Sequence, residues 1–162
     1  MSLELLVQRL GTVLQQSRRC LVTAESCTGG WVGREITAVP GCSHWYERGF
    51  ITYTNRAKQE MLGVQADTLE RFGAVSEATV REMAQGALRH SHAQVALAIS
   101  GIAGPDGGTP EKPVGTVWLA WAGEDFATAV EHHLYAGDRE AVRRQAVADA
   151  LHGLMKLVDQ RT

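Results

Sequence analysis

The chain has 162 residues, of which 44% are hydrophobic, and this is enough apolar side chain for the core of one domain over residues 1–162. Sixteen basic and eighteen acidic residues give a net charge of −2, which argues against a nucleic-acid partner. No apolar stretch approaches the roughly 20 residues that span a bilayer, and the first residues lack the pattern of a secretory signal. The three cysteines show no C-x-x-C spacing. These features predict a cytoplasmic protein with free thiols and no membrane partner.

The first half of the chain alternates helices and strands. Apolar residues at three- and four-residue spacing predict a helix over 3–17, and residues 20–24 form a short buried strand. Residues 25–30 then turn into a helix that runs to about residue 37 and stops before Pro40-Gly41. Residues 48–54 alternate like a strand, and Asn55 is the expected N-cap of a helix over 56–62.

The second half ends in a hairpin and a long helix. Asp67 and Ser76 are the expected N-caps of two further helices, the second of which continues to about residue 90. Residues 94–100 form an apolar run that is typical of a strand covered on both faces. After a loop over 101–115, strands over 116–122 and 126–135 form the hairpin, and a helix runs from 138 to about 158. This order predicts a three-layer α/β/α sandwich with a mixed sheet.

The first candidate for chemistry is the segment Glu25-Ser-Cys-Thr-Gly-Gly30, which joins a predicted strand to a predicted helix. Backbone N–H groups at a helix start are unpaired and can hold an oxyanion, so Ser26 is placed to attack a carbonyl there. Two alternatives stay open. Ser26 or Thr28 caps the helix and has no other role, or Cys27 is the nucleophile, because a helix start lowers the pKa of a thiol.

The second candidate is Lys58, in the first turn of the helix that follows Tyr53. A cation near a helix N-terminus is disfavoured by the dipole, and that field together with burial lowers a lysine pKa toward about 7 to 8, where the amine acts as a base. Tyr53 is expected to end the preceding strand. On the residues alone, an exposed surface lysine is the favoured interpretation.

The third candidate is the long loop over 101–115, rich in glycine and proline, with Ser100 at the end of the buried strand before it. A long loop inside a compact domain is often functional, and a hydroxyl at a strand's carboxyl end can face a ligand. A surface loop with ordinary turns and no such role is the alternative that stays open. Arg139 and Arg143 share one helix face and are solvated charges unless that end of the helix meets the site. The histidines have no spacing that predicts a metal site, since His132 and His133 face opposite sides of a strand.

Three motifs in order, Ala24-Glu-Ser-Cys-Thr-Gly-Gly30, Thr52-Tyr-Thr-Asn-x-x-Lys58 and Ser100-Gly-Ile-Ala-Gly-Pro105 with the following Lys112-Pro-Val-Gly-Thr-Val117, resemble the CinA C-terminal domain family. The resemblance runs from the first helix through Arg139 and is to the stand-alone form. It implies a Ser–Lys mechanism whose residues are a nucleophile, a base and an assisting tyrosine, namely Ser26, Lys58 and Tyr53. It also suggests that Ser100 and Arg139 bind substrate. With Ser26 as the nucleophile, the backbone N–H groups of Cys27, Thr28, Gly29 and Gly30 are expected to contact the substrate by stabilising the oxyanion.

Active members of that family are nicotinamide-nucleotide amidases, also called NMN deamidases. The resemblance therefore implies hydrolysis of nicotinamide mononucleotide to nicotinate mononucleotide and ammonia, as part of pyridine nucleotide salvage. It implies neither a metal nor an organic cofactor, and it suggests self-association into a homo-oligomer. Two alternatives stay open: a non-catalytic nucleotide-binding module that uses the Gly-rich loops as an anion cradle, and an amidase whose substrate lacks the phosphate.

Overall fold

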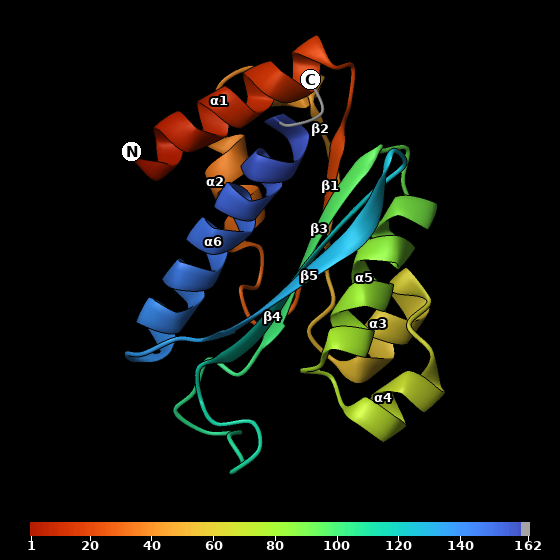
Figure 1. Cartoon of the computed structure of the whole chain (residues 1–162), viewed down its shortest axis with the longest axis vertical. Coiled ribbons are helices and arrows are strands. Elements are labelled where there is room, and N and C mark those ends of the chain that lie inside the picture. The colour runs from red at the N-terminus through yellow and green to blue at the C-terminus, as the bar shows by residue number, and fades with distance from the viewer. Residues whose placement is uncertain (160–162) are drawn as a thin grey trace.

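The computed structural model describes residues 1–159 and consists of one sheet between two layers of helices (Figure 1). The last three residues of the expected domain, 160–162, lie outside the described residues. The helices are α1 (Leu3–Gln16), α2 (Trp31–Thr37), α3 (Asn55–Leu62), α4 (Ala66–Phe72), α5 (Glu77–Arg89) and α6 (Arg139–Asp159), with a 3₁₀ turn at Cys42–His44. The strands are β1 (Leu21–Glu25), β2 (Tyr46–Ile51), β3 (Val95–Gly101), β4 (Thr116–Gly123) and β5 (Phe126–Leu134).

The five strands form a mixed sheet in the order β2-β1-β3-β4-β5. The first three of these strands are parallel, whereas β4 runs antiparallel to β3 and β5 antiparallel to β4. The predicted late hairpin is therefore confirmed, and so is the mixed sheet. The side chains of Val95–Ser100 are buried on both faces of β3, as the apolar run predicted.

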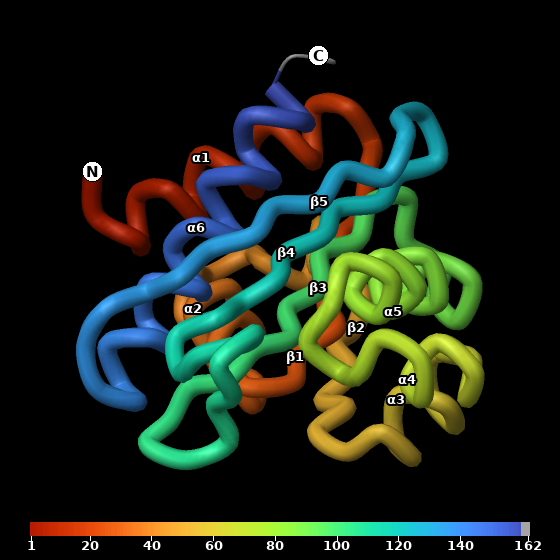
Figure 2. Tube along the Cα trace, turned by 60° about the horizontal axis from the view of Figure 1, so that its bottom comes forward, coloured from red at the N-terminus to blue at the C-terminus, as the bar shows by residue number. Residues whose placement is uncertain are grey.

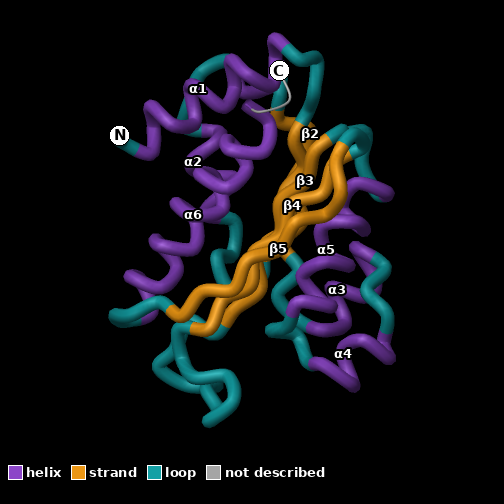
Figure 3. The backbone as a smooth tube through the Cα atoms, viewed as in Figure 1, coloured by secondary structure: helices purple, strands orange, loops and turns teal. Residues whose placement is uncertain are grey.

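Helices α1, α2 and α6 cover one face of the sheet, and α3, α4 and α5 cover the other (Figure 3). Each face has its own apolar core, with Trp45 and Trp121 in the first and Val80 and Met83 in the second. The indole of Trp121 also donates a hydrogen bond of 2.9 Å to the carbonyl oxygen of Ala150 in α6. The predicted three-layer α/β/α sandwich is confirmed.

The connections that follow β1 and β2 leave the sheet on opposite faces. The chain passes from β1 into α2 on one face and from β2 into α3 on the other. In open α/β sheets, such a divergence leaves a crevice at the carboxyl ends of the strands, where ligands bind. Figure 2 shows the loop after β3 and the amino end of α6 at this same edge. The topology thus gathers the three candidate segments at one place.

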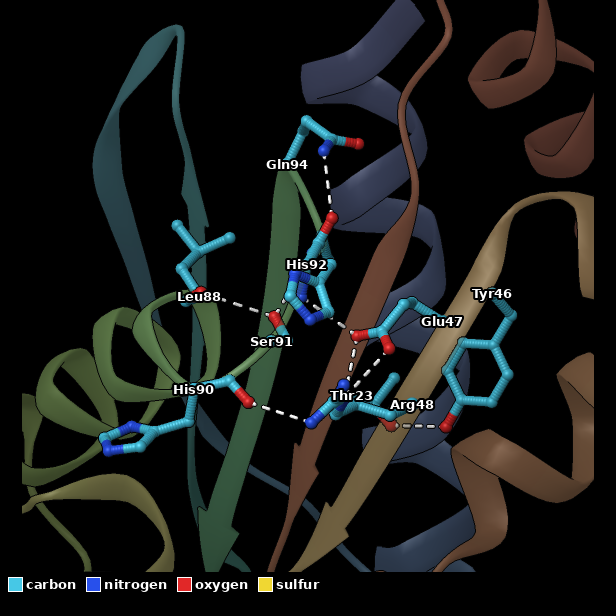
Figure 4. Close-up of polar contacts among 10 residues, drawn as sticks. Thr23, Tyr46, Glu47, Arg48, Leu88, His90, Ser91, His92 and Gln94 are labelled. Atoms are coloured by element: carbon cyan, nitrogen blue, oxygen red, sulfur yellow. Dashed lines mark hydrogen bonds and ion pairs between the residues drawn. The ribbon is translucent and has the colours of Figure 1, made fainter.

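Local hydrogen bonds close the opposite, amino end of the parallel strands (Figure 4). Arg48 of β2 donates to the carbonyl oxygen of His90 at 3.1 Å, and its neighbour Glu47 accepts from the backbone N–H of His92 at 3.1 Å. Gln94 in turn donates to the carbonyl oxygen of His92 at 3.0 Å. These bonds tie the turn between α5 and β3 to β2.

Several predicted boundaries and caps were wrong. Strand β2 begins at Tyr46 and ends at Ile51, so Tyr53 lies beyond the strand. The N-cap of α3 is Thr54, whose hydroxyl accepts from the Ala57 N–H at 3.0 Å, and Asn55 is the first helical residue. Both residues carry a capping oxygen, and only the backbone geometry separates them.

The cap predictions for the next two helices had different outcomes. Helix α4 starts at Ala66, so Asp67 lies inside its first turn, where its carboxylate pairs with Arg71 at 3.6 Å instead of capping. Ser76 is the N-cap of α5, and its hydroxyl accepts from the Thr79 N–H at 3.2 Å. That prediction is confirmed.

Candidate active site

Ser26 and Lys58 lie in contact at the carboxyl edge of the sheet. Ser26 directly follows β1, and its N–H donates to the carbonyl oxygen of Ile99 in β3 at 3.0 Å, which extends the sheet pairing by one residue. Its Oγ lies 3.0 Å from the Nζ of Lys58. Lys58 is only 1% exposed, so the favoured interpretation of an exposed surface lysine was wrong. Helix α3 packs against α5, and this packing turns the lysine inward.

The surroundings of the Lys58 amine suit a neutral base. Its Nζ donates to the carbonyl oxygens of Thr52 at 2.9 Å and Tyr53 at 3.3 Å. As an ammonium, the Nζ also donates to the Ser26 Oγ. Once neutral, it keeps two N–H donors for the two carbonyls, and its lone pair can then accept the proton of the Ser26 hydroxyl. Burial lowers the pKa of Lys58 from 10.5 to about 8. The lysine can therefore accept a proton from Ser26 near neutral pH.

Cys27 is a poor nucleophile in this setting. The side chain is 6% exposed, and burial raises the pKa of its thiol to about 11 despite the nearby positive charge of Arg143. The expected lowering of this pKa by a helix start was wrong, because α2 begins at Trp31 rather than beside Cys27. Desolvation is thus the dominant effect, and the thiol stays protonated at neutral pH.

Glu25 organises the turn that follows β1. Its carboxylate is 2% exposed and accepts hydrogen bonds from the Thr28 hydroxyl at 2.7 Å and from the N–H groups of Val32 and Gly33 at 2.9 and 3.2 Å. Glu25 therefore binds the first amides of α2, and neither Ser26 nor Thr28 caps that helix. Sequence reasoning missed this role, although a carboxylate just before a helix start is the signal for it.

Two backbone donors in the turn remain for a ligand. Within residues 1–159, neither the N–H of Cys27 nor that of Thr28 donates a hydrogen bond to another residue. Gly29 has a φ of +56° and Gly30, the N-cap of α2, a φ of +103°, and both conformations favour glycine. The N–H of the residue after a serine nucleophile is a common oxyanion donor, and here that residue is Cys27.

A cavity of about 250 Å³ opens beside the serine and the lysine. The predicted site residues that line it are Ser26, Cys27, Tyr53, Lys58, Ser100 and Arg139. Thr28, Gly29 and Gly30 line a neighbouring cavity instead, next to Arg143. The Ser100 hydroxyl donates to the carbonyl oxygen of Ala74 at 2.7 Å, so its oxygen faces a ligand only as an acceptor.

Arg139 joins two walls of the cavity. Its guanidinium donates to the carbonyl oxygen of Gly104 at 2.7 Å and to the hydroxyl of Tyr53 at 3.0 Å. The Tyr53 side chain is 57% exposed, and its backbone carbonyl, on the other side of the residue, contacts Lys58. The phenol therefore bonds the arginine, whereas the backbone of the same residue supports the lysine.

Arg143 contacts the backbone of the turn that follows β1. Its Nε donates to the carbonyl oxygen of Cys27 at 3.0 Å and its Nη2 to that of Thr28 at 3.3 Å. The guanidinium lies over the ring of Trp31, 5.3 Å from the ring centroid. The amino end of α6 does reach the site, so Arg139 and Arg143 are not simply solvated charges. Their shared helix face was the sequence signal for this.

Within residues 1–159, no group of three or more His, Cys, Asp or Glu side chains is placed to hold a metal ion. No helix in this part of the chain is both long and apolar enough to cross a membrane.

Comparison with known proteins identifies the family. The model of the CinA C-terminal domain matches residues 3–158. The nicotinamide-nucleotide amidohydrolase PncC of Escherichia coli K12 is 52% identical over 157 residues, which cover 97% of this chain and 95% of that protein. The protein of the same name from Pseudomonas putida is 51% identical over 152 residues, which cover 94% of each.

A solved structure agrees with these sequence matches. The competence/damage inducible protein CihA from Agrobacterium tumefaciens superposes with a TM-score of 0.94 at 43% identity, covering 97% of this chain and 99% of that one. With relatives this similar, the chain is an amidohydrolase with an α/β fold. Within that class it belongs to the CinA C-terminal domain family, which confirms the resemblance seen in the motifs.

Proposed function

We propose that this amidohydrolase hydrolyses the carboxamide of nicotinamide mononucleotide, with Ser26 as nucleophile and Lys58 as general base. The observation that carries the proposal is the 3.0 Å contact between the Ser26 Oγ and an amine that is 1% exposed. The names of the relatives in Escherichia coli and Pseudomonas putida support the substrate.

The first half of the reaction is acylation of the serine. Neutral Lys58 takes the hydroxyl proton as the Ser26 Oγ attacks the amide carbon. The oxygen of the tetrahedral intermediate accepts a hydrogen bond from the N–H of Cys27, and a donor of this kind is worth about 3 kcal/mol. Lys58, now an ammonium, returns the proton to the departing nitrogen, and ammonia leaves. The result is an ester between Ser26 and the nicotinate carbonyl.

The second half reverses these roles. Lys58 is neutral again and takes a proton from a water molecule that attacks the ester carbonyl. Collapse of the second intermediate breaks the bond to the Ser26 Oγ, which regains its proton from the lysine. Nicotinate mononucleotide leaves, and the enzyme is ready for another cycle. One amide and one water are consumed, and the carboxylic acid and ammonia that form become a carboxylate and an ammonium ion at neutral pH.

The cavity supports a substrate with a small planar head and a longer anionic tail. At about 250 Å³ it lies below the roughly 300 Å³ of small drug-like sites, so it suits the pyridine carboxamide and leaves ribose and phosphate to extend outward. The guanidinium of Arg139, held by Gly104 and Tyr53, supplies positive charge at the cavity wall. We assign Tyr53 an orienting role toward Arg139, and we place the reaction in pyridine nucleotide salvage.

An ammonia-release assay on matched carboxamides tests the proposal. We expect turnover of nicotinamide mononucleotide and much weaker turnover of nicotinamide riboside, which lacks the phosphate. Equal rates on both compounds would contradict the assigned substrate, because the phosphate would then contribute nothing. Tight binding of the mononucleotide in calorimetry without ammonia release would instead identify a non-catalytic nucleotide-binding module.

A further inference from the structure

Arg143 is linked to the proposed oxyanion donor through two peptide groups. Its Nη2 donates to the carbonyl oxygen of Thr28, and the N–H of that same peptide, carried by Gly29, donates to the carbonyl oxygen of Ser26 at 3.0 Å. The peptide that contains the Ser26 carbonyl also carries the N–H of Cys27. A trans peptide holds its C=O and N–H in opposite directions, so fixing one fixes the other.

The second bond of Arg143 holds the peptide between these two. Its Nε donates to the carbonyl oxygen of Cys27 at 3.0 Å, and this sets the plane of the peptide whose N–H belongs to Thr28. One guanidinium therefore orients three successive peptide groups, starting at the nucleophile itself. The guanidinium of Arg143 also lies over the ring of Trp31, 5.3 Å from the ring centroid, and this contact limits its movement away from the two carbonyls.

We propose that Arg143 is a positioning residue that directs the Cys27 N–H toward the developing oxyanion, without touching the substrate. This inference rests on the proposed function, since it assumes attack by Ser26. A charged donor at one end of a hydrogen-bonded peptide chain also polarises the next bond, which makes the Cys27 N–H a stronger donor. Glu25 cannot replace the arginine, because its carboxylate bonds N–H and hydroxyl groups rather than the carbonyls.

Two features separate Arg143 from Arg139. Arg139 lines the cavity beside Ser26, whereas Arg143 lines the neighbouring cavity on the far side of the turn. Both bonds of Arg143 described above end on backbone carbonyls of the turn. A residue in this place is expected to change the rate of the chemical step and to leave the binding of the ground state nearly unchanged.

The test compares Arg143→Gln with Arg144→Gln in steady-state hydrolysis of nicotinamide mononucleotide. Arg144 is the next residue on α6 and pairs with Glu140 at the surface at 2.9 Å, so its variant loses the same charge without disturbing the turn. We expect Arg143→Gln to lower kcat at least tenfold with KM within threefold, and Arg144→Gln to match the unmodified enzyme. The dissociation constant of nicotinate mononucleotide, from calorimetry, is expected to stay within threefold in both.

The variant Arg143→Lys is the control for loss of folding. Lysine keeps the positive charge, but its amine can donate to only one of the two carbonyl oxygens at a time. We expect its kcat to lie between those of the unmodified enzyme and Arg143→Gln, with a thermal midpoint close to that of the unmodified enzyme. A kcat of Arg143→Gln within twofold of Arg144→Gln would overturn the inference. A raised KM with unchanged kcat would also overturn it, because Arg143 would then be a substrate-binding residue.

Ser26→Ala, assayed in parallel, separates this inference from the function on which it rests. Failure of the unmodified enzyme to release ammonia from nicotinamide mononucleotide, or full activity in Ser26→Ala, rejects the proposed function itself. An inactive Ser26→Ala together with a fully active Arg143→Gln rejects only the role of Arg143.

Discussion

The Nζ of Lys58 lies 3.0 Å from the Oγ of Ser26, although 32 residues separate them in the chain. The contact exists because Ser26 follows β1 and Lys58 belongs to the helix after β2, the strand that pairs with β1 in parallel. The pairing of two strands thus brings a nucleophile and its base together at the edge where both strands end.

Replacing Ser26 by alanine is expected to abolish ammonia release, whereas Cys27→Ala keeps at least a tenth of the activity. The reason is that Cys27 contributes its backbone N–H, and the pKa of its thiol, about 11, leaves it protonated at neutral pH. The activities of both variants are measured as ammonia release from nicotinamide mononucleotide at pH 7.5. The nucleophile assignment fails if Cys27→Ala loses all activity while Ser26→Ala retains it.

The pH dependence of kcat is expected to report the Lys58 amine. Only its neutral form accepts the serine proton, and burial holds the pKa at about 8, so activity rises with pH and levels off above that value. Below it, the rate falls tenfold for each pH unit. A rate profile between pH 6 and 10 measures this, with Lys58→Arg as the inactive control because a guanidinium keeps its proton. A midpoint near 10 would show that the lysine is not the base.

Tyr53→Phe is expected to leave the apparent pKa of kcat near 8 and to reduce kcat/KM less than tenfold, mainly through KM. The phenol oxygen bonds Arg139, whereas Lys58 is supported by the Tyr53 backbone carbonyl, which the variant retains. Steady-state kinetics across pH measure both effects. A loss of kcat as large as that of Ser26→Ala would instead assign the hydroxyl to proton transfer.

Glu25→Gln is expected to destabilise the fold by about 1–3 kcal/mol, since one of the two carboxylate oxygens becomes an NH2 group that cannot accept from the buried donor facing it. The carboxylate binds Thr28 and the first amides of α2, which makes this substitution costly despite its small size. Urea unfolding measures the change, with Glu140→Gln at an exposed site as the matched control. Equal stability of the two variants would show that the capping of α2 by Glu25 contributes little.

The sequence by itself determined the order of elements and the location of the candidate segments. The apolar run at 94–100, the helical spacing in residues 3–17 and the late hairpin are local patterns, because they report which faces of one element are buried. They were sufficient to predict the sandwich. The residue motifs were sufficient to single out Ser26 and Lys58, although the residues alone favoured an exposed lysine.

Only the tertiary structure decided which of these residues meet. The burial of Lys58, and with it the lowered pKa, depends on how α3 packs against α5 and the sheet. The contact of Arg143 with Cys27 spans 116 positions, and it depends on how α6 packs beside α2 on one face of the sheet. Periodicity describes the environment of one segment at a time, whereas a distance between segments follows from strand order and helix packing, which no local pattern contains.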